Sequence, residues 1–145
     1  MSFLDALRTS ASGLSAQRLR MNLISSNLAN INTTRTAEGG PYKRKDAVFA
    51  ANPQQPSFEE ALSRQMEPQN VEVQVTEIRD DLRQPIVKYD PGHPDADKDG
   101  YVTLPNINVV EEMVNMISAS RSYEANVTAI RATKEMASDA MDIGR

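Results

Sequence analysis

The chain has 145 residues, a formal net charge of −4 and a sequence pI near 5.0. This acidic balance argues against nucleic acid as a ligand, because phosphate binding needs a concentrated basic face. The absence of cysteine excludes disulfides and thiolate chemistry. No apolar run approaches the roughly 18 to 20 residues that span a bilayer, so we expect one domain without stable membrane insertion.

Residues 2 to 31 have the spacing of an amphipathic helix. Gly13 inside this stretch costs about 1 kcal/mol relative to Ala, so the helix needs packing to be stable. Its large apolar residues recur at near-heptad spacing, and we call them the amino-terminal seam: Leu7, Leu14, Met21, Ile24 and Leu28.

The middle of the chain is predicted to consist of loops and short strands. Gly39-Gly40-Pro41 is a firm break after the first helix. Proline residues bracket a short candidate helix from Ser57 to Met66. Valines alternate with polar residues from Val71 onward, which is typical of a half-buried strand. The other candidate strands are 42–49, 86–89 and 101–104.

Residues 108 to 143 are predicted to form one long helix, with Asn108 as its N-cap. A helix of this length reaches roughly 50 Å, which is more than the rest of the chain can cover. We therefore expect its apolar face to pack against other subunits. The alternatives are a bundle within one chain, or a membrane surface, which favours a basic polar face. We call its apolar residues the carboxy-terminal seam: Val109, Met113, Met116, Tyr123, Val127 and Ile130.

These elements predict a mainly helical α+β protein with three regions. Residues 1–35 form an amino-terminal helical arm, residues 36–107 a loop and β-rich middle, and residues 108–145 a long helix. The first region carries four Arg and one Asp, whereas the last is net acidic, so their charges are complementary. We expect the two arms to pack in coiled-coil fashion as one inner helical domain.

A calcium site and an enzymatic site are the two kinds of chemistry that the sequence raises. Asp95 to Gly100 matches the opening of an EF-hand loop, but Asn106 replaces the glutamate required at the twelfth position. A tight turn between short strands is the favoured interpretation, and a calcium-binding module is an alternative. The one histidine, His93, has no nearby nucleophile. We expect no catalytic residues, cofactor or metal, and no enzyme.

Three stretches of the chain resemble flagellar axial proteins of the rod and hook. Residues 26–33, with the sequence SNLANINT, resemble the amino-terminal signature of that family, including Asn27, Asn30 and Thr33. Residues 89–113 and 117–126 resemble the proximal rod members of the family, whereas residues 50–70 have no match and no assigned role. In this signature we expect Asn27 and Asn30 to satisfy backbone groups where the first helix ends.

The resemblance implies a structural subunit of the proximal rod of the bacterial flagellar basal body. Such a subunit assembles with copies of itself and other rod proteins into the drive shaft that transmits torque across the periplasm. The implied partners also include the adaptor that joins the rod to the membrane ring and export gate. Export through the flagellar type III apparatus agrees with the lack of a recognisable signal peptide. Both seams then become subunit interfaces. A self-contained helical adaptor is the remaining alternative.

Overall fold

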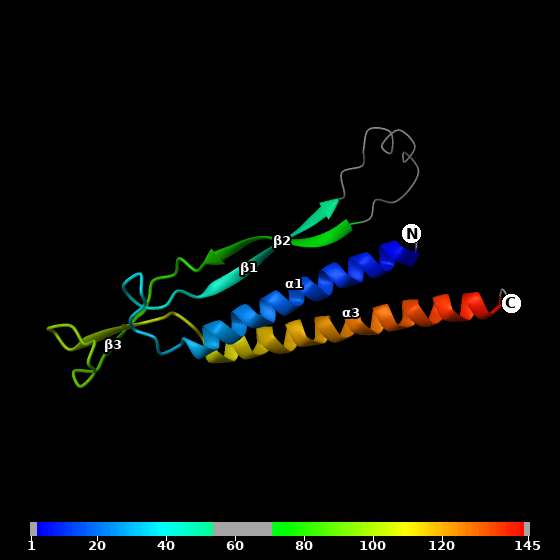
Figure 1. Ribbon diagram of the computed structural model, residues 1–145. Coiled ribbons are helices and arrows are strands. Elements are labelled where there is room, and N and C mark those ends of the chain that lie inside the picture. Colours follow the sequence, from blue (N-terminus) through cyan, green and yellow to red (C-terminus); the bar gives the residue numbers. More distant parts are fainter. Residues whose placement is uncertain (1–2, 54–70, 144–145) are drawn as a thin grey trace.

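The computed structural model describes residues 3–53 and 71–143, which form two long helices and two small antiparallel sheets (Figure 1). The α+β fold predicted from the sequence is confirmed. In chain order the elements are α1 (Phe3–Ala29), β1 (Lys45–Pro53), β2 (Val71–Asp80), β3 (Ile86–Tyr89), β4 (Tyr101–Leu104) and α3 (Val109–Ile143). The candidate helix from Ser57 to Met66 lies outside the described residues.

The two helices pack side by side and antiparallel, so that both chain termini lie at the same end of the pair (Figure 1). Small residues allow this close approach, since Ala16 and Ala119 are buried. A Cβ atom on Gly13 would lie 3.0 Å from Asn126 Nδ2. Gly13 therefore helps the two helices to pack closely, because its missing side chain leaves room for Asn126 of α3.

A larger side chain at this crossing should force the helices apart. We expect Gly13→Leu to lower the free energy of unfolding by about 1–3 kcal/mol, the usual cost of overpacking. Urea denaturation of the purified chain measures the effect. Ala11→Leu, at an exposed position on the same helix, is the control and should change stability little. Equal effects of the two substitutions would contradict a tight crossing at Gly13.

The start of α3 follows the capping rule. Asn108 Oδ1 accepts hydrogen bonds from the backbone N–H groups of Val110, at 2.9 Å, and Glu111, at 3.4 Å. These bonds satisfy amides that have no partner inside the helix. The helix then continues for 35 residues. No helix among the described residues combines the length and the apolar character that crossing a membrane requires.

The β1–β2 hairpin lies along α1 (Figure 1). Its register pairs Lys45 with Asp80 and Pro53 with Val71, with a bulge between Val48 and Phe49. Two hydroxyls of α1 contact the β2 backbone: Thr9 Oγ1 donates to Val71 O at 3.5 Å, and Val73 N donates to Ser12 Oγ at 3.1 Å. The hairpin is thus attached to the first half of α1.

Two predictions for this hairpin need correction. The first strand begins at Lys45 rather than Tyr42, because Tyr42 N donates to Thr33 O in the preceding loop. The strand from Val71 exists, but of its three alternating valines only Val75 is half-buried, whereas Val71 and Val73 are 40% and 37% exposed. A two-stranded sheet with one helix beside it offers too few neighbours to cover these valines.

The β3–β4 hairpin has the bounds expected from the sequence, with Ile86 opposite Leu104 and Tyr89 opposite Tyr101. The two tyrosine rings meet edge to face at 5.3 Å. Its connection, residues 90–100, ends in a tight turn in which Gly100 has a φ of 81° and Asp97 N donates to Tyr101 O. No group of acidic, His or Cys side chains among the described residues is arranged to hold a metal ion.

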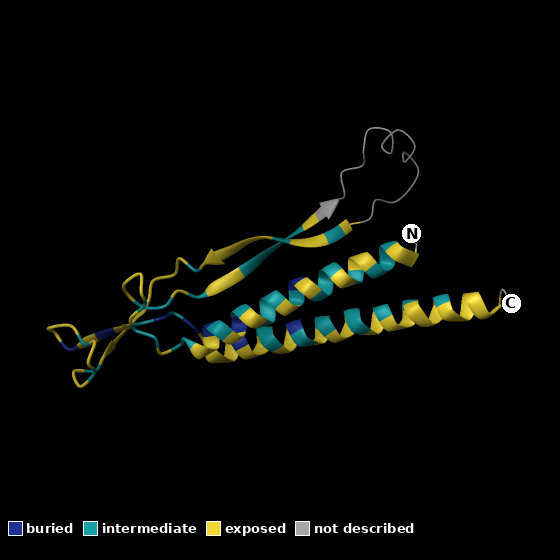
Figure 2. Cartoon of the chain, viewed as in Figure 1, coloured by how far each residue is buried: buried dark blue, intermediate teal, exposed yellow. Residues whose placement is uncertain are grey.

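The buried core is small and lies mainly near the end where α1 finishes and α3 begins (Figure 2). On the side of the chain termini, α1 before Ala16 and α3 after Ala119 contain no buried residue among those described (Figure 2). The buried hydrophobic residues are Ala16, Ile24, Val102, Ile107 and Ala119. A core of this size leaves much of the apolar surface of the chain without a partner.

Candidate assembly surfaces and a buried polar junction

A buried polar cluster, which we call the polar junction, joins α1, the start of β1 and the start of α3. It consists of the side chains of Asn27, Tyr42, Arg44 and Glu112 and the backbone of Lys45. Asn27 and Glu112 are its centre, with exposed fractions of 0% and 1%. Three segments distant in sequence are therefore held together at one point.

Asn27 uses both ends of its side-chain amide in the polar junction. Its Nδ2 donates to Lys45 O at 2.9 Å and to Glu112 Oε2 at 3.1 Å. Its Oδ1 accepts from Lys45 N at 2.9 Å and from the Tyr42 hydroxyl at 3.1 Å. The amide thus pairs with β1 as a neighbouring strand residue would, which fixes where that strand begins.

The Glu112 carboxylate is neutralised by Arg44, whose Nε donates to Glu112 Oε1 at 2.7 Å. Burial opposes the charge of the guanidinium, but the hydrogen bond and the negative charge of Glu112 outweigh it and raise the pKa of Arg44. A buried carboxylate with two donors is tolerated, whereas an unpaired one would be costly. The ion pair therefore ties the orientation of the β1 entry to the first turn of α3.

Of the two signature asparagines, Asn30 contacts the helix end as predicted, whereas the prediction for Asn27 is wrong. Asn30 Nδ2 donates to Ser26 O at 2.9 Å, a backbone group near the end of α1, and Thr33 Oγ1 donates to Asn30 Oδ1 at 3.1 Å. Asn27, however, binds the backbone of Lys45 and not that of the helix end. It belongs to the connection between elements.

Sequence reasoning missed Arg44 and Glu112. Glu112 had a detectable signal, because it falls between Val109 and Met116 at helical spacing. A charged residue at such a position needs a buried partner or must lie at an exposed edge. Arg44 is 68 residues away from Glu112, in a stretch without periodicity, so nothing local identified it as that partner.

The structure buries one residue of the amino-terminal seam and leaves the other four partly or largely exposed. Ile24 is 4% exposed and Leu28 is 36% exposed. The seam residues that are half-buried between these extremes are Leu7, Leu14 and Met21. Because α1 contacts both α3 and the β1–β2 hairpin, it is covered on two sides. Part of this seam therefore serves packing within the chain.

The carboxy-terminal seam divides into two groups. The half-buried group is Met116, Tyr123, Val127 and Ile130, whereas Val109 and Met113 are 42% and 53% exposed. Among the described elements α3 packs on α1 alone. The first turns of α3 instead expose four large apolar residues at spacings of three and four, which we call the outer α3 patch: Val110, Met113, Val114 and Ile117.

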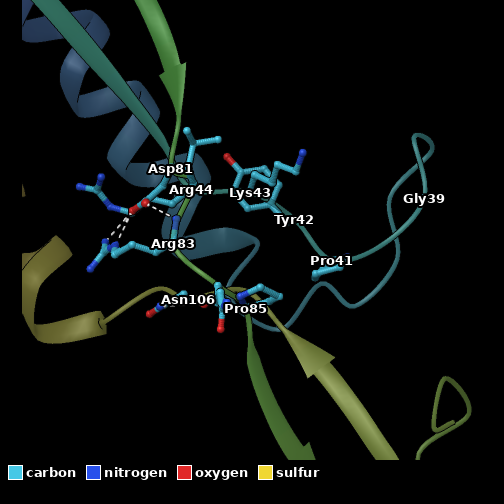
Figure 3. Close-up of a pocket in the computed structure, with 11 residues that line it drawn as sticks. Gly39, Pro41, Tyr42, Lys43, Arg44, Asp81, Arg83, Pro85 and Asn106 are labelled. Carbon is cyan, nitrogen blue, oxygen red and sulfur yellow. Dashed lines mark hydrogen bonds and ion pairs between the residues drawn. The ribbon is translucent and has the colours of Figure 1, made fainter.

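A cavity of about 340 Å³ lies beside the polar junction, between residues 39–44, residues 81–85 and Asn106 (Figure 3). At its edge Arg83 donates to Asp81 at 2.7 Å, and this hydrogen bond lowers the pKa of the Asp81 carboxyl. Leu82, which also lines the cavity, is 90% exposed. The cavity thus combines an uncovered apolar side chain with charged groups.

Comparison with known proteins agrees with the architecture. A family model described as "Flagella basal body rod protein" matches residues 7–35. A second, described as "Flagellar basal body rod FlgEFG protein C-terminal", matches residues 98–143. These two matches cover α1 from its second turn and the whole of α3.

The chain also has full-length relatives. The flagellar basal-body rod protein FlgC of Borreliella burgdorferi is 44% identical, over 99% of this chain and 98% of that protein. The same protein of Bacillus subtilis is 43% identical over the whole of both chains. That of Aquifex aeolicus is 46% identical over 94% of this chain and 92% of its own. The chain therefore belongs to the flagellar basal-body rod protein family, in its FlgC branch.

Proposed function

We propose that this structural rod subunit forms part of the proximal rod and helps to build the drive shaft that transmits motor torque across the periplasm. The observation that supports this most directly is the outer α3 patch, in which four apolar side chains are between 53% and 68% exposed. Clustered apolar surface of this kind marks protein contacts. The helices α1 and α3 already pack on each other, and these four side chains are still exposed. The patch is therefore available to a neighbouring subunit.

In this proposal the helical arms, residues 1–35 and 108–145, form the inner domain of the rod, and residues 36–107 form the outer region. The exposed parts of both seams, together with the outer α3 patch, contact neighbouring subunits. Such contacts join different surfaces on the two partners, so they do not close as a symmetric dimer, and they propagate as a helix when the rotation between subunits does not close a ring.

The proposed partners are copies of this chain, other proximal and distal rod proteins, and the adaptor between the rod and the membrane ring with its export gate. We propose export through the flagellar type III apparatus without a cleavable signal. The sequence supports this route because it contains no cysteine whose oxidation would have to be controlled outside the cytoplasm. The role is structural, with no enzymatic step.

The first test is an in-frame deletion of the gene, with complementation. We expect the deletion to abolish motility and to leave basal bodies without a rod beyond the membrane ring. Complementation should restore both. Intact rods and normal swimming in a deletion strain shown by sequencing to carry no second copy of the gene would contradict the proposed function.

A substitution in the outer α3 patch should separate folding from assembly. We expect Val114→Asp to fold with a free energy of unfolding within about 0.5 kcal/mol of the parent, since Val114 is 60% exposed. It should nevertheless block incorporation into rods, because a desolvated charge at a contact lacks a partner. Counting the subunit in purified basal bodies by immunoblot measures this.

The matched control for the patch is Thr128→Asp, which places the same charge at another exposed position of α3. Val127→Asp is informative in another way. Val127 is half-buried on the helix pair, so this variant should lose both stability and incorporation. Normal incorporation of Val114→Asp would remove the outer α3 patch from the assembly interface.

A further inference from the structure

The carboxyl end of α3 has an unusual balance of charge. Between Lys134 and Arg145 the sequence holds three acids, Glu135, Asp139 and Asp142, and no base. The last turn of α3 as described contains no basic residue. A helix carries partial negative charge at this end, so acids there are unfavourable and a cation from elsewhere would be stabilising.

The same end of α3 is also apolar and uncovered. Met136, Met141 and Ile143 are 64%, 70% and 87% exposed. One reason is that α3 has 35 residues whereas its partner α1 has 27. The last turns of α3 thus have large side chains, negative charge and little covering surface.

The cavity beside the polar junction offers an exposed cation, because the acid on its wall, Asp81, is already bound to Arg83. Lys43 lines it, is exposed, and forms no ion pair with a described residue. Figure 3 shows Lys43 and Tyr42 next to one another on the cavity wall, with Pro85 and Asn106 on another part of it. Leu82 adds an apolar surface that is 90% exposed. An apolar, acidic segment fits this lining.

We propose that this cavity receives the carboxyl end of α3 of a second copy of this chain, with its exposed Met136, Met141 and Ile143. Leu82 and the proline walls contact its apolar side chains, and Lys43 faces its carboxylates. The inference rests on the proposed rod function and adds to it a specific donor and acceptor. It assigns a role to the end of α3, which the outer α3 patch does not involve.

The cavity cannot receive the α3 end of its own chain. Asn106, which lines the cavity, lies just before the first residue of α3. A helix of 35 residues is roughly 50 Å long at about 1.5 Å per residue, so the two features lie at opposite ends of one molecule. A contact between them is necessarily intermolecular and runs head to tail, which gives an open filament when the rotation between subunits does not close a ring.

The test places a photo-crosslinking amino acid at position 82 of the full chain in a strain that assembles rods. Purified basal bodies are irradiated and the crosslinked peptide is sequenced by mass spectrometry. We expect a peptide from the last turns of α3 of this chain, whereas a peptide from another rod protein would overturn the inference. The same amino acid at Val87, which is 61% exposed on β3, is the control and should not capture that helix.

Charge reversal supplies a second measurement. Lys43→Glu should lower the crosslink yield from position 82 by roughly tenfold, because like charges then face each other. Lys88→Glu, an exposed reversal outside the cavity, should not. Position-82 crosslinks to any other segment, or an unchanged yield in Lys43→Glu, would overturn the inference. If those results came from intact rods containing the chain, the proposed rod function would still hold.

Discussion

Glu112→Ala is expected to lower the free energy of unfolding by about 3–5 kcal/mol, the usual effect of breaking a buried ion pair on one side. The Arg44 guanidinium, with 12% of its side chain exposed, would lose its carboxylate partner at 2.7 Å. Asn27 would lose the acceptor of one of its Nδ2 bonds. Urea denaturation followed by circular dichroism measures the loss.

Two further variants show whether the loss comes from the Arg44 cation, whose remaining carboxylate partner would be the 58% exposed Asp46 at 3.6 Å. Glu111→Ala changes the exposed neighbouring glutamate and should alter stability by less than about 0.5 kcal/mol. Arg44→Met combined with Glu112→Leu removes both charges and should recover much of the stability, because apolar replacement of a buried pair is often close to neutral. A double variant as unstable as Glu112→Ala would mean that the pair acts through its hydrogen bonds instead.

Asn27→Asp is expected to cost about 3 kcal/mol or more, although it changes the shape of the side chain very little. The new oxygen cannot donate to Lys45 O or Glu112 Oε2, so two buried acceptors lose their donor. It also brings a second negative charge toward Glu112. Thermal unfolding of the purified chain, together with rod incorporation in cells, measures the effect.

A helix-matched control and a compensating change test this explanation. Asn22→Asp, at an exposed position of α1, should be close to neutral. Adding Glu112→Gln to Asn27→Asp restores one donor–acceptor pair between positions 27 and 112 and should recover part of the lost stability. Asn27→Asp as stable as the parent chain would show that the polar junction does not hold the three segments together.

Much of the fold followed from local pattern. The heptad spacing of Leu7, Leu14 and Met21 predicted α1, and Asn108 marked the start of α3. The strands 86–89 and 101–104 were predicted with their actual bounds. These signals depend on residues within a few positions of one another, which is where propensity and periodicity act.

Non-local contacts were the ones that sequence could not supply. Asn27 and Glu112 are 85 residues apart, and only the antiparallel pairing of the helices brings them together. The exposure of Val71 and Val73 was missed for a related reason. Alternation shows that a strand has two different faces, but not whether the chain contains anything to cover the apolar one.

The attachment of the hairpin to α1 has a mechanical consequence. Hydrogen bonds fix β2 to α1 at Thr9 and Ser12, and fix the start of β1 to the same helix at Asn27. These anchor points are roughly 25 Å apart at 1.5 Å per helical residue. Because the hairpin is held to α1 at separated points, it cannot slide along the helix when the helix bends, and it must stretch or compress instead. The hairpin and α1 therefore bend as one layered unit, which is stiffer than two elements free to slip past each other.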